Sequence, residues 1–516
     1  MSTINNNTSQ LANRVVLGVA SVAMLLRYYF AAIIPLGNDE VYYWDWGRDL
    51  RLSYFDHPPG VSWLAAGAQE IFGKSTLGLQ ARGLIPALHF VTSLILFKIY
   101  IDLAGKRRRR TGDIAFLCMT QLIPAFGIGG FVLLPDAGLL LFASAGLLLT
   151  TRLAKMNSPG LRAGLAAGLI AGFAGLFKYH AAPIFAGLFL GLAAARNWDF
   201  RRTKIFWGTT LVTGLVTTLP VWIWNAQNNM ASFTFQANRG IAGANFNLLR
   251  ASRTLAGEFL FLTPGFFILL AMTVFNLWRH RKHSTEKIIL GSTLPLLLLI
   301  HVTMMYKEVL PHWGLPAFWL LIPAAAIFAG QQWSATKLHR NVVMAGVITT
   351  LIIAVAGIPA IRSGLIDRAK GYPGALGELT FWPEFSRSPQ FADLQDKIGS
   401  SLTQAKTVNC PAQPILASFR WFSVAHMAWS LPGQPVVRFF EDGAKYYYHD
   451  RDRKLDASNY SPETVSFSGC PVLAIGERAH ANLSEIQDRM NVALTGEIVI
   501  GQYLDRPLSW WAGYLK

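Results

Sequence analysis

Two acidic residues stand side by side after the first long apolar stretch of the chain, and aromatic residues follow them. Asp39 and Glu40 are separated from Tyr43 by only two residues. Carboxylates beside such rings suit the boundary between membrane and water. A partly desolvated carboxylate is a stronger base than one in water, so this pair could remove the proton of an attacking hydroxyl. Solvated acids in an interfacial aromatic belt are the alternative interpretation.

Further ionisable residues occur in other segments between apolar stretches. Asp136 follows Pro135 at the junction of two such stretches, where an unpaired acid is costly and usually functional. The accompanying residues of interest are Asp56, His57, Lys178, Arg239, Lys307, His312 and Trp313. Each cation alone could be a snorkelling or surface residue. Together, a carboxylate and a set of cations could provide a base for a nucleophile and positive charge for a departing phosphate.

The elements that must position these residues are long enough to cross a membrane. Of the 516 residues, 52% are apolar and 15% are charged, against roughly 25% charged in an ordinary soluble domain. A helix that crosses the bilayer needs about 20 mostly apolar residues. We predict about eleven such helices, near residues 12–35, 77–104, 114–134, 137–154, 162–177, 181–196, 205–224, 255–278, 288–305, 313–330 and 341–361. The first is too long for a cleaved signal and is expected to be a retained anchor.

The charge distribution predicts how these helices are oriented. The net charge is +17, but residues 363–516 hold 15 Lys and Arg against 16 Asp and Glu, so the surplus belongs to residues 1–362. Basic clusters occupy every second connection, at residues 106–110, 152–162, 196–204, 279–287 and 337–340. These connections and the N-terminus are therefore predicted to be cytoplasmic, with the chemistry-bearing segments outside. A polybasic nucleic-acid binder is excluded by the same distribution.

The remaining chain, residues 363–516, is predicted to form a soluble α/β domain outside the membrane, next to a membrane domain at residues 1–362. Apolar, β-rich pieces at Ile415–Phe419, Val436–Phe440, Val472–Ile475 and Ile498–Ile500 alternate with helix-like stretches at Gln390–Leu402 and Leu483–Val492. Cys410 and Cys470 each precede a predicted strand and could form a disulfide in an oxidising compartment. Two unpaired buried thiols are the alternative.

Taken in order, these motifs resemble the bacterial members of the protein-mannosyltransferase superfamily. These proteins are integral-membrane glycosyltransferases of the C-type fold and include the aminoarabinose transferase of lipid A. The resemblance extends over nearly the whole chain and lies in Asp39-Glu40 with Tyr43, Tyr54–Pro59, Pro135-Asp136, Lys178-Tyr179, Phe233–Gly240, Lys307–Trp313 and Ala425–Val436.

The resemblance implies an inverting transfer of a sugar from a polyprenyl-phosphate-linked donor on the outer face of the membrane. Asp39 matches the presumed catalytic base of such enzymes, Glu40 its acidic neighbour, and Asp136 a second acid that orients the acceptor or the site. The implied acceptor is lipid A or another envelope glycan or lipid, less often a protein. The implied location is the bacterial inner membrane, with the C-terminal domain in the periplasm.

The resemblance also implies which residues contact the substrates. His57 stands where the aminoarabinose transferase carries a lysine that contacts lipid phosphate, and a histidine there gives a weaker, pH-sensitive contact. Arg239 and Lys307 are therefore the better candidates for the phosphate, with Lys178 third. Tyr43, Asp56, His312 and Trp313 belong to the same motifs and are expected to line the substrate site. The sequence contains no His or Cys spacing typical of zinc, although outer carboxylates could hold a divalent ion loosely.

A transporter or flippase of a lipid-linked or anionic substrate is the main alternative, because intramembrane charges and Gly-rich helices also mark permeation paths. The ionisable residues gather on one side, however, with Arg27 and Glu258 as the exceptions, and the chain shows no repeated halves. A non-catalytic domain on a membrane anchor would not need eleven helices. The enzyme hypothesis requires Asp39, Asp136 and several cations to meet in one cavity.

Overall fold

The computed structural model divides the chain into two compact units. One unit comprises residues 1–33 and 50–359, and the other comprises residues 34–49 and 360–516. The residues that the structure describes are 2–73, 78–196, 200–239, 245–332, 337, 340–341, 344–349, 351–352, 378–402, 410, 413–418, 421–431, 436–438, 469–476, 486–487, 490–499 and 508–515. The predicted domain boundary at residue 362 and most of the predicted helix at 341–361 lie outside them.

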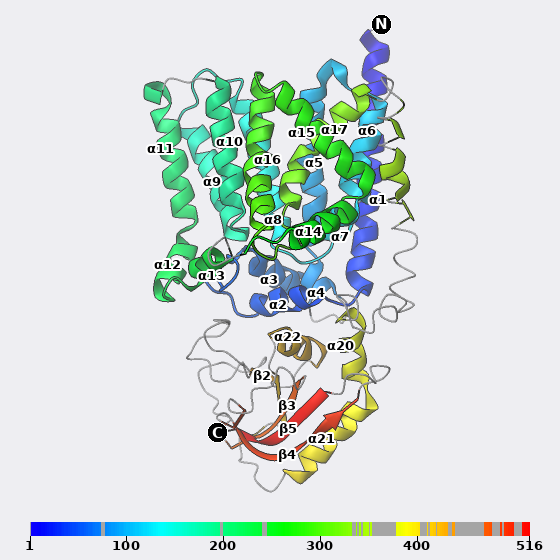
Figure 1. The fold of residues 1–516 in the computed structure, drawn as a ribbon, viewed down its shortest axis with the longest axis vertical. Helices are drawn as coiled ribbons and strands as arrows, with labels where there is room; N and C mark the ends of the chain where they lie inside the picture. The colour runs from blue at the N-terminus through cyan, green and yellow to red at the C-terminus, as the bar shows by residue number, and fades with distance from the viewer. Residues whose placement is uncertain are drawn as a thin grey trace. The chain divides into compact units, whose positions relative to one another are not determined.

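The first unit is a bundle of apolar helices (Figure 1). Five of its described helices are long and apolar enough to cross a membrane, or up to seven if each bent pair counts as one span. The long helices of the bundle include α1 (Ser2–Ile33), α5 (Ile85–Ala104), α8 (Asp136–Leu153), α9 (Leu161–Phe177), α10 (Ala181–Arg196), α11 (Phe200–Thr217), α16 (Ser284–Thr303) and α17 (Leu315–Gln332). The prediction of a polytopic helical protein is therefore confirmed, while the number of eleven spans stays a prediction.

Helix α17 lies in the middle of the bundle's core. Most of its residues are buried, and Trp319 is fully buried with its indole nitrogen donating to Ser144 Oγ at 3.0 Å. Small residues bring other helices close together: a side chain at Gly187 of α10 would collide with the backbone of Gly291 in α16. Glycine at such positions favours tight packing of helices in membranes.

Three of the predicted apolar stretches are not single straight helices. Residues 114–134 form α6 (Arg110–Leu117), a π-helix (Cys118–Leu122) and α7 (Pro124–Gly129). Residues 205–224 are divided between α11 and α12 (Leu219–Gln227), which bend by 49°. Residues 255–278 are divided between α14 (Leu248–Phe261) and α15 (Pro264–Arg279), which bend by 104°. In each case a proline is the first or second residue of the last piece, where its missing N–H donor is not needed.

The buried Arg27 of α1 donates hydrogen bonds at the first of these breaks, the one within residues 114–134. Its guanidinium donates to Gln121 Oε1 at 2.6 Å, to the Gln121 carbonyl at 3.2 Å and to the Gly127 carbonyl at 3.3 Å. These backbone oxygens lie where the helix is interrupted and need a donor. Arg27 therefore satisfies an irregular backbone segment within the bundle.

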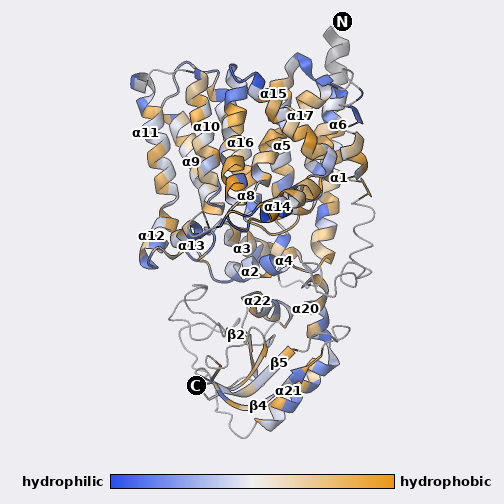
Figure 2. Cartoon of the chain, in the orientation of Figure 1, coloured by the Kyte–Doolittle hydropathy of each residue, from blue (hydrophilic) through white to orange (hydrophobic). Residues whose placement is uncertain are grey.

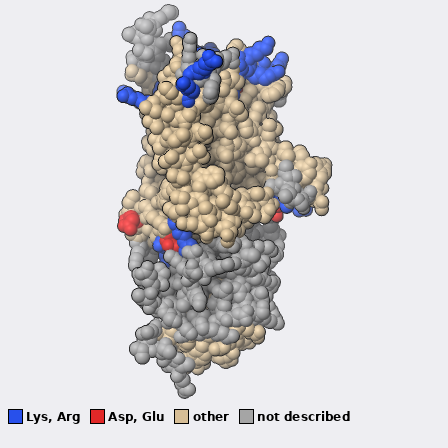
Figure 3. Space-filling model, turned by 90° about the vertical axis from the view of Figure 1, so that its left-hand side faces the viewer, with Lys and Arg blue, Asp and Glu red and all other residues tan. Residues whose placement is uncertain are grey.

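Basic residues gather at one end of the first unit (Figure 3). The end of α10, the start of α11 and the connection from α15 to α16 lie at this end, together with the N-terminus (Figure 1). Hydrophobic residues cover the helices between the hydrophilic ends (Figure 2). This distribution agrees with the predicted common side of the basic connections. That this side is the cytoplasm stays a prediction.

The second unit contains a five-stranded sheet with the strand order β2-β1-β3-β5-β4. The central strand β3 (Pro471–Gly476) pairs in parallel with β1 (Ile415–Ser418), which pairs in parallel with β2 (Val436–Arg438). On the other side, β5 (Leu508–Leu515) runs antiparallel to β3 and to β4 (Met490–Ile498). The predicted α/β class is confirmed. The predicted helix near Leu483–Val492 is wrong at its end, because Met490 already begins β4.

Helices of the second unit are α2 (Asn38–Gly47), α20 (Glu378–Arg387), α21 (Pro389–Ser401) and α22 (Trp421–Ser430). Helix α2 precedes the bundle's second helix in the chain, yet it packs against α22. Trp44 of α2 and Trp429 of α22 meet edge to face, with ring centroids 4.9 Å apart. The segment that carries Asp39 and Glu40 thus belongs to the unit that contains the sheet.

A disulfide links Cys410 to Cys470, whose Cα atoms are 5.4 Å apart. Cys470 is fully buried in the cluster formed by Ile415, Val472 and Trp511. The bond closes a loop across a sequence separation of 60 residues, and in the chain-entropy model such a loop contributes about 4 kcal/mol to stability.

We expect a Cys410→Ser/Cys470→Ser variant to melt at a temperature several degrees lower than the wild type. The cross-link restricts the unfolded chain, so its loss favours unfolding. Differential scanning fluorimetry of the full protein in detergent, with and without reductant, measures the change. The reductant should have no further effect on the variant. Three titratable thiols in the unreduced, denatured wild type would contradict the bond.

Candidate active site

A buried ion pair forms the centre of the candidate site in the first unit. Asp136 begins α8 directly after Pro135, and Lys178 ends α9 at the corner that leads to α10. The Lys178 ammonium lies 2.9 Å from Asp136 Oδ1 and 2.7 Å from Oδ2. The side chain of Lys178 is 4% exposed and that of Asp136 is 18% exposed. A buried ammonium needs a counterion, so the two charges compensate each other.

Three histidines surround this pair. Burial and the nearby Lys178 charge lower the pKa of His180 to about 3 and that of His312 to about 4. The same two causes lower the pKa of His57 well below its usual value. All three imidazoles are therefore neutral near pH 7 and offer hydrogen bonds without charge. The sequence suggested a pH-sensitive contact at His57, but its environment moves this titration far below neutrality.

Arg239 provides positive charge next to these groups. It follows α13 (Ala231–Asn238) and is exposed, and its guanidinium lies over the rings of Phe235 and Trp313 at 4.4 and 5.3 Å. The ring of Trp313 also approaches that of His180, with centroids 6.1 Å apart. Ring faces attract a cation without neutralising it, and no carboxylate of the described residues forms an ion pair with Arg239. Its charge thus remains available to an anionic ligand.

The loop before α3 (Gly60–Phe72) is held against α13. Gln236 donates to the carbonyl oxygen of Asp56 at 2.6 Å, and the rings of Phe55 and Phe235 lie 4.5 Å apart. The hydroxyls of Tyr179 and Ser232 are 2.7 Å apart. These contacts bring together four motifs that the sequence analysis identified separately, those around residues 56, 136, 178 and 239.

A cavity of about 190 Å³ lies next to the ion pair. Its polar lining residues are Asp136, His312 and His89. The rest of the lining is mainly apolar and comes from the residues Pro124, Ala125, Phe126, Ile128, Gly129, Val132, Leu134, Ala137, Leu140, Phe261, Leu315 and Pro316. An apolar cavity with a few polar groups in its lining suits a ligand with a hydrocarbon part and a polar head.

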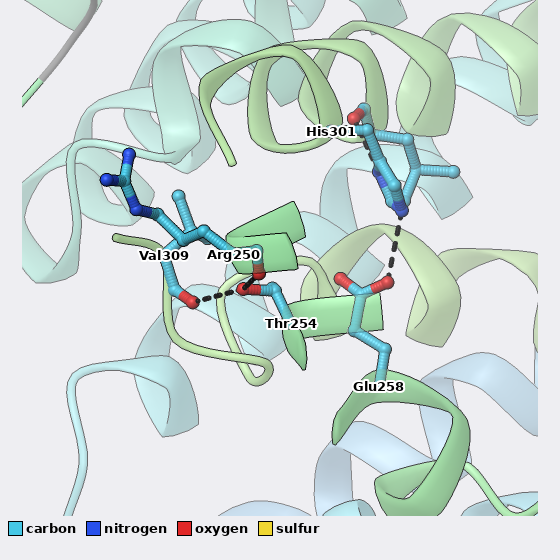
Figure 4. Close-up of polar contacts among 6 residues, drawn as sticks. Arg250, Thr254, Glu258, His301 and Val309 are labelled. Carbon is cyan, nitrogen blue, oxygen red and sulfur yellow. Dashed lines mark hydrogen bonds and ion pairs between the residues drawn. The ribbon is translucent and has the colours of Figure 1, made fainter. Parts of the chain in front are cut away.

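Helix α14 holds the connection between α16 and α17, which carries His312 and Trp313. Thr254 Oγ1 donates to the Val309 carbonyl at 3.0 Å (Figure 4). Arg250 donates to the Tyr306 carbonyl at 2.6 Å. The carboxylate of Glu258 is fully buried and lies 3.0 Å from His301 Nε2 (Figure 4).

The end of this connection lies against Glu258. A side chain at Gly314 would come within 2.9 Å of Glu258 Oε1, so the connection approaches α14 as closely as a glycine permits. Glu258 therefore has a structural role that the sequence analysis did not assign. The signal that could have indicated it is a carboxylate inside an apolar stretch.

Among the described residues, no contact links Lys307 to the Asp136–Lys178 pair. Its backbone nitrogen donates to the Thr303 carbonyl at 2.8 Å, and its side chain is partly buried. A phosphate contact by Lys307 therefore stays a prediction.

The predicted base and its neighbours lie on α2, in the second unit. Asp39 is exposed, whereas Glu40 is 4% exposed and its Oε2 accepts a hydrogen bond from the Gly37 nitrogen at 3.1 Å. Glu40 therefore stabilises the start of α2. Tyr43 is buried, with its ring 5.1 Å from that of Trp46. That Asp39 and Asp136 meet in one cavity stays a prediction. The catalytic and binding roles of the site residues also stay predictions.

Among the residues with described positions, no group of three or more His, Cys, Asp or Glu side chains could hold a metal ion.

Comparison with known proteins supports the resemblance seen in the sequence. Residues 56–224 match the family described as dolichyl-phosphate-mannose-protein mannosyltransferase. The chain is also similar to the lipid A galacturonosyltransferase RgtD of Rhizobium johnstonii, with 26% identity over 285 residues, which is 54% of this chain and 58% of that protein. The matched segment therefore spans less than two thirds of this relative.

The fold is similar to that of a solved membrane protein. The structure of ArnT from Cupriavidus metallidurans in the apo state superimposes with a TM-score of 0.59 at 14% identity, over 99% of this chain and 98% of the other. The structure of the same protein bound to undecaprenyl phosphate gives a TM-score of 0.59 at 15% identity, over 98% of both chains. The similarity confirms the predicted C-type fold.

Proposed function

We propose that this chain is a membrane glycosyltransferase of the protein-mannosyltransferase superfamily, and that it transfers a sugar from a polyprenyl-phosphate-linked donor to an acceptor of the cell envelope. The observation that carries the proposal is the Asp136–Lys178 pair, which lies beside a mainly apolar cavity and near Arg239, whose guanidinium lies over Trp313. A lipid-linked phosphate has the matching chemistry, since its chain is apolar and its head carries negative charge.

In the proposed reaction, an acceptor hydroxyl attacks the anomeric carbon of the donor sugar. The new bond joins the acceptor oxygen to that carbon, and the bond from the carbon to the phosphate oxygen breaks on the opposite face, which inverts the configuration. Asp39 takes the proton of the hydroxyl, and the polyprenyl phosphate leaves with an additional negative charge. Arg239 stabilises this charge, and a fixed donor of this kind can contribute about 3 kcal/mol.

The ion pair orients the site in this proposal. Lys178 keeps the Asp136 carboxylate ionised and fixed, and the partly exposed Asp136 accepts hydrogen bonds from the acceptor hydroxyls. The neutral histidines His57, His180 and His312 provide further hydrogen bonds to the sugar or the phosphate. Their neutrality leaves Arg239 as the principal positive charge, so we propose a phosphodiester donor with a single negative charge at this position.

The substrates are proposed from the named relatives. RgtD is named for its action on lipid A, and ArnT is bound to undecaprenyl phosphate in one of the solved structures. We propose an undecaprenyl-phosphate hexose or pentose as donor and lipid A, or another envelope glycan or lipid, as acceptor. The proposed location is the bacterial inner membrane, with the N-terminus in the cytoplasm and the second unit in the periplasm.

Two measurements test the proposal. Mass spectrometry of envelope lipids from cells with and without the protein should reveal a lipid whose mass falls by one sugar residue when the protein is missing. The purified protein in detergent should then transfer that sugar from its undecaprenyl phosphate to the same lipid. Because detergent leaves no second compartment, transport alone cannot produce this result. An unchanged lipid profile together with inactive purified protein would refute the transferase.

A further inference from the structure

We infer that His426 of α22 is a positioning residue for Asp39, because it fixes the first turn of α2 through Asn38. The inference deepens the proposed function, since it rests on Asp39 being the base. It assigns a role to the Ala425–Val436 segment, which the sequence analysis identified only by resemblance.

The imidazole of His426 is held on two sides within the second unit. Its Nε2 donates to the side-chain oxygen of Asn38, the first residue of α2, at 2.9 Å. Its ring stacks on that of Trp382 in α20, with centroids 5.0 Å apart and an angle of 9° between the planes. His426 is 2% exposed and Trp382 is 6% exposed. Burial lowers the pKa of His426 to about 3, so the ring stays neutral near pH 7.

Asp39 lies between two fixed neighbours. On one side, Asn38 is bonded to His426; on the other, Glu40 is bonded to the Gly37 backbone at 3.1 Å. The side chain of Asp39 is exposed and thus faces away from the packed interior. The hydrogen bonds of Asn38 and Glu40 therefore help to set the conformation of its backbone.

Helix α22 contacts α2 at two well-separated points. His426 bonds to Asn38 at the start of α2, and Trp429 contacts Trp44 near its end. Two such points fix both the position of α2 along its axis and its rotation. Displacement of a catalytic group by about 1 Å can lower the rate about 100-fold, so loosening the first turn should reduce the rate of the chemical step.

The experiment compares variants that keep or remove the hydrogen bond in the full protein. His426→Phe keeps a flat ring for Trp382 and removes the donor, whereas His426→Gln retains an N–H donor. Asn38→Ala removes the acceptor and, because Asn38 is only partly buried, leaves the interior intact. Met427→Leu, at a buried neighbour on the same helix, is the matched packing control. The measurements are kcat and KM for the undecaprenyl-phosphate sugar and hydrogen exchange of the residue 38–41 amides.

For His426→Phe and for Asn38→Ala, we expect kcat to fall about 10- to 100-fold with KM nearly unchanged. The double variant should lose no more than either single one, because both remove the same bond. Exchange at residues 38–41 should become about tenfold faster. His426→Gln should recover most of kcat, and Met427→Leu should resemble the wild type.

Two results would overturn the inference. The first is an unaltered kcat in Asn38→Ala or in a folded His426→Phe protein. The second is a fall in kcat without faster exchange at residues 38–41. The Asp39→Asn variant separates this inference from the proposed function. If Asp39→Asn stays active, the proposed base is wrong; if it is inactive while His426→Phe is unimpaired, only the positioning role is wrong.

Discussion

We expect asparagine in place of Asp39 to reduce sugar transfer severely while membrane insertion and folding stay intact. The amide has nearly the same shape as the carboxylate but cannot take up the proton of the acceptor hydroxyl. General-base catalysis contributes about 10²- to 10⁴-fold to a rate, and we expect a loss in this range. Because Asp39 is exposed, the substitution leaves the packing of α2 undisturbed. The rate of transfer from undecaprenyl-phosphate sugar to its acceptor in detergent measures the effect.

Asp49→Asn is the matched control for this substitution, since Asp49 is an acid of the same segment that lies outside α2. It should retain the wild-type rate. The Asp39→Asn protein should elute from a size-exclusion column as the wild type does and should melt at the same temperature. Retention of more than about a tenth of the wild-type rate, a difference below about 1.4 kcal/mol in the barrier, would remove Asp39 from the role of base.

We expect loss of the Lys178 charge to lower both activity and stability. In the Lys178→Met variant, the partly buried carboxylate of Asp136 loses the ammonium group that lies 2.7 Å away in the wild type. Breaking such a pair by removing one member costs about 3–5 kcal/mol. The carboxylate then becomes neutral or changes its position, so the orientation of the acceptor is lost as well. We expect at least about a 100-fold lower transfer rate and a lower melting temperature.

The exposed Lys98–Asp102 pair is the matched control. The side chain of Lys98 is 48% exposed, and solvent-exposed pairs contribute only about 0.3–0.5 kcal/mol. Lys98→Met should therefore alter neither rate nor melting temperature. An Asp136→Asn/Lys178→Met double variant should regain stability relative to Lys178→Met, because it buries no uncompensated charge, but it should stay inactive. Wild-type activity in Lys178→Met would contradict the role of the pair.

Features that depend on short stretches of chain could be predicted from the sequence. The helices α5, α8, α16 and α17 coincide with predicted apolar stretches, because a run of apolar residues is a local property. The strands β1, β2 and β3 begin where β-rich pieces were predicted. The breaks before Pro124 and Pro264 were missed, because apolar composition alone does not reveal where a helix changes direction. The predicted helix near residue 490 failed because pairing with β5 stabilises β4 there.

The candidate site likewise combines features that the sequence predicts with features that only tertiary packing sets. The sequence by itself determined which residue types were available, namely the acids, the cations and the aromatic residues between apolar segments. Only the tertiary structure decided that Asp136 pairs with Lys178, 42 residues away, and that Glu258 meets His301, 43 residues away. It also decided that α2 packs with α22, with His426 and Asn38 separated by 388 residues. Such contacts depend on the packing of whole elements against one another, which no local pattern of residues encodes.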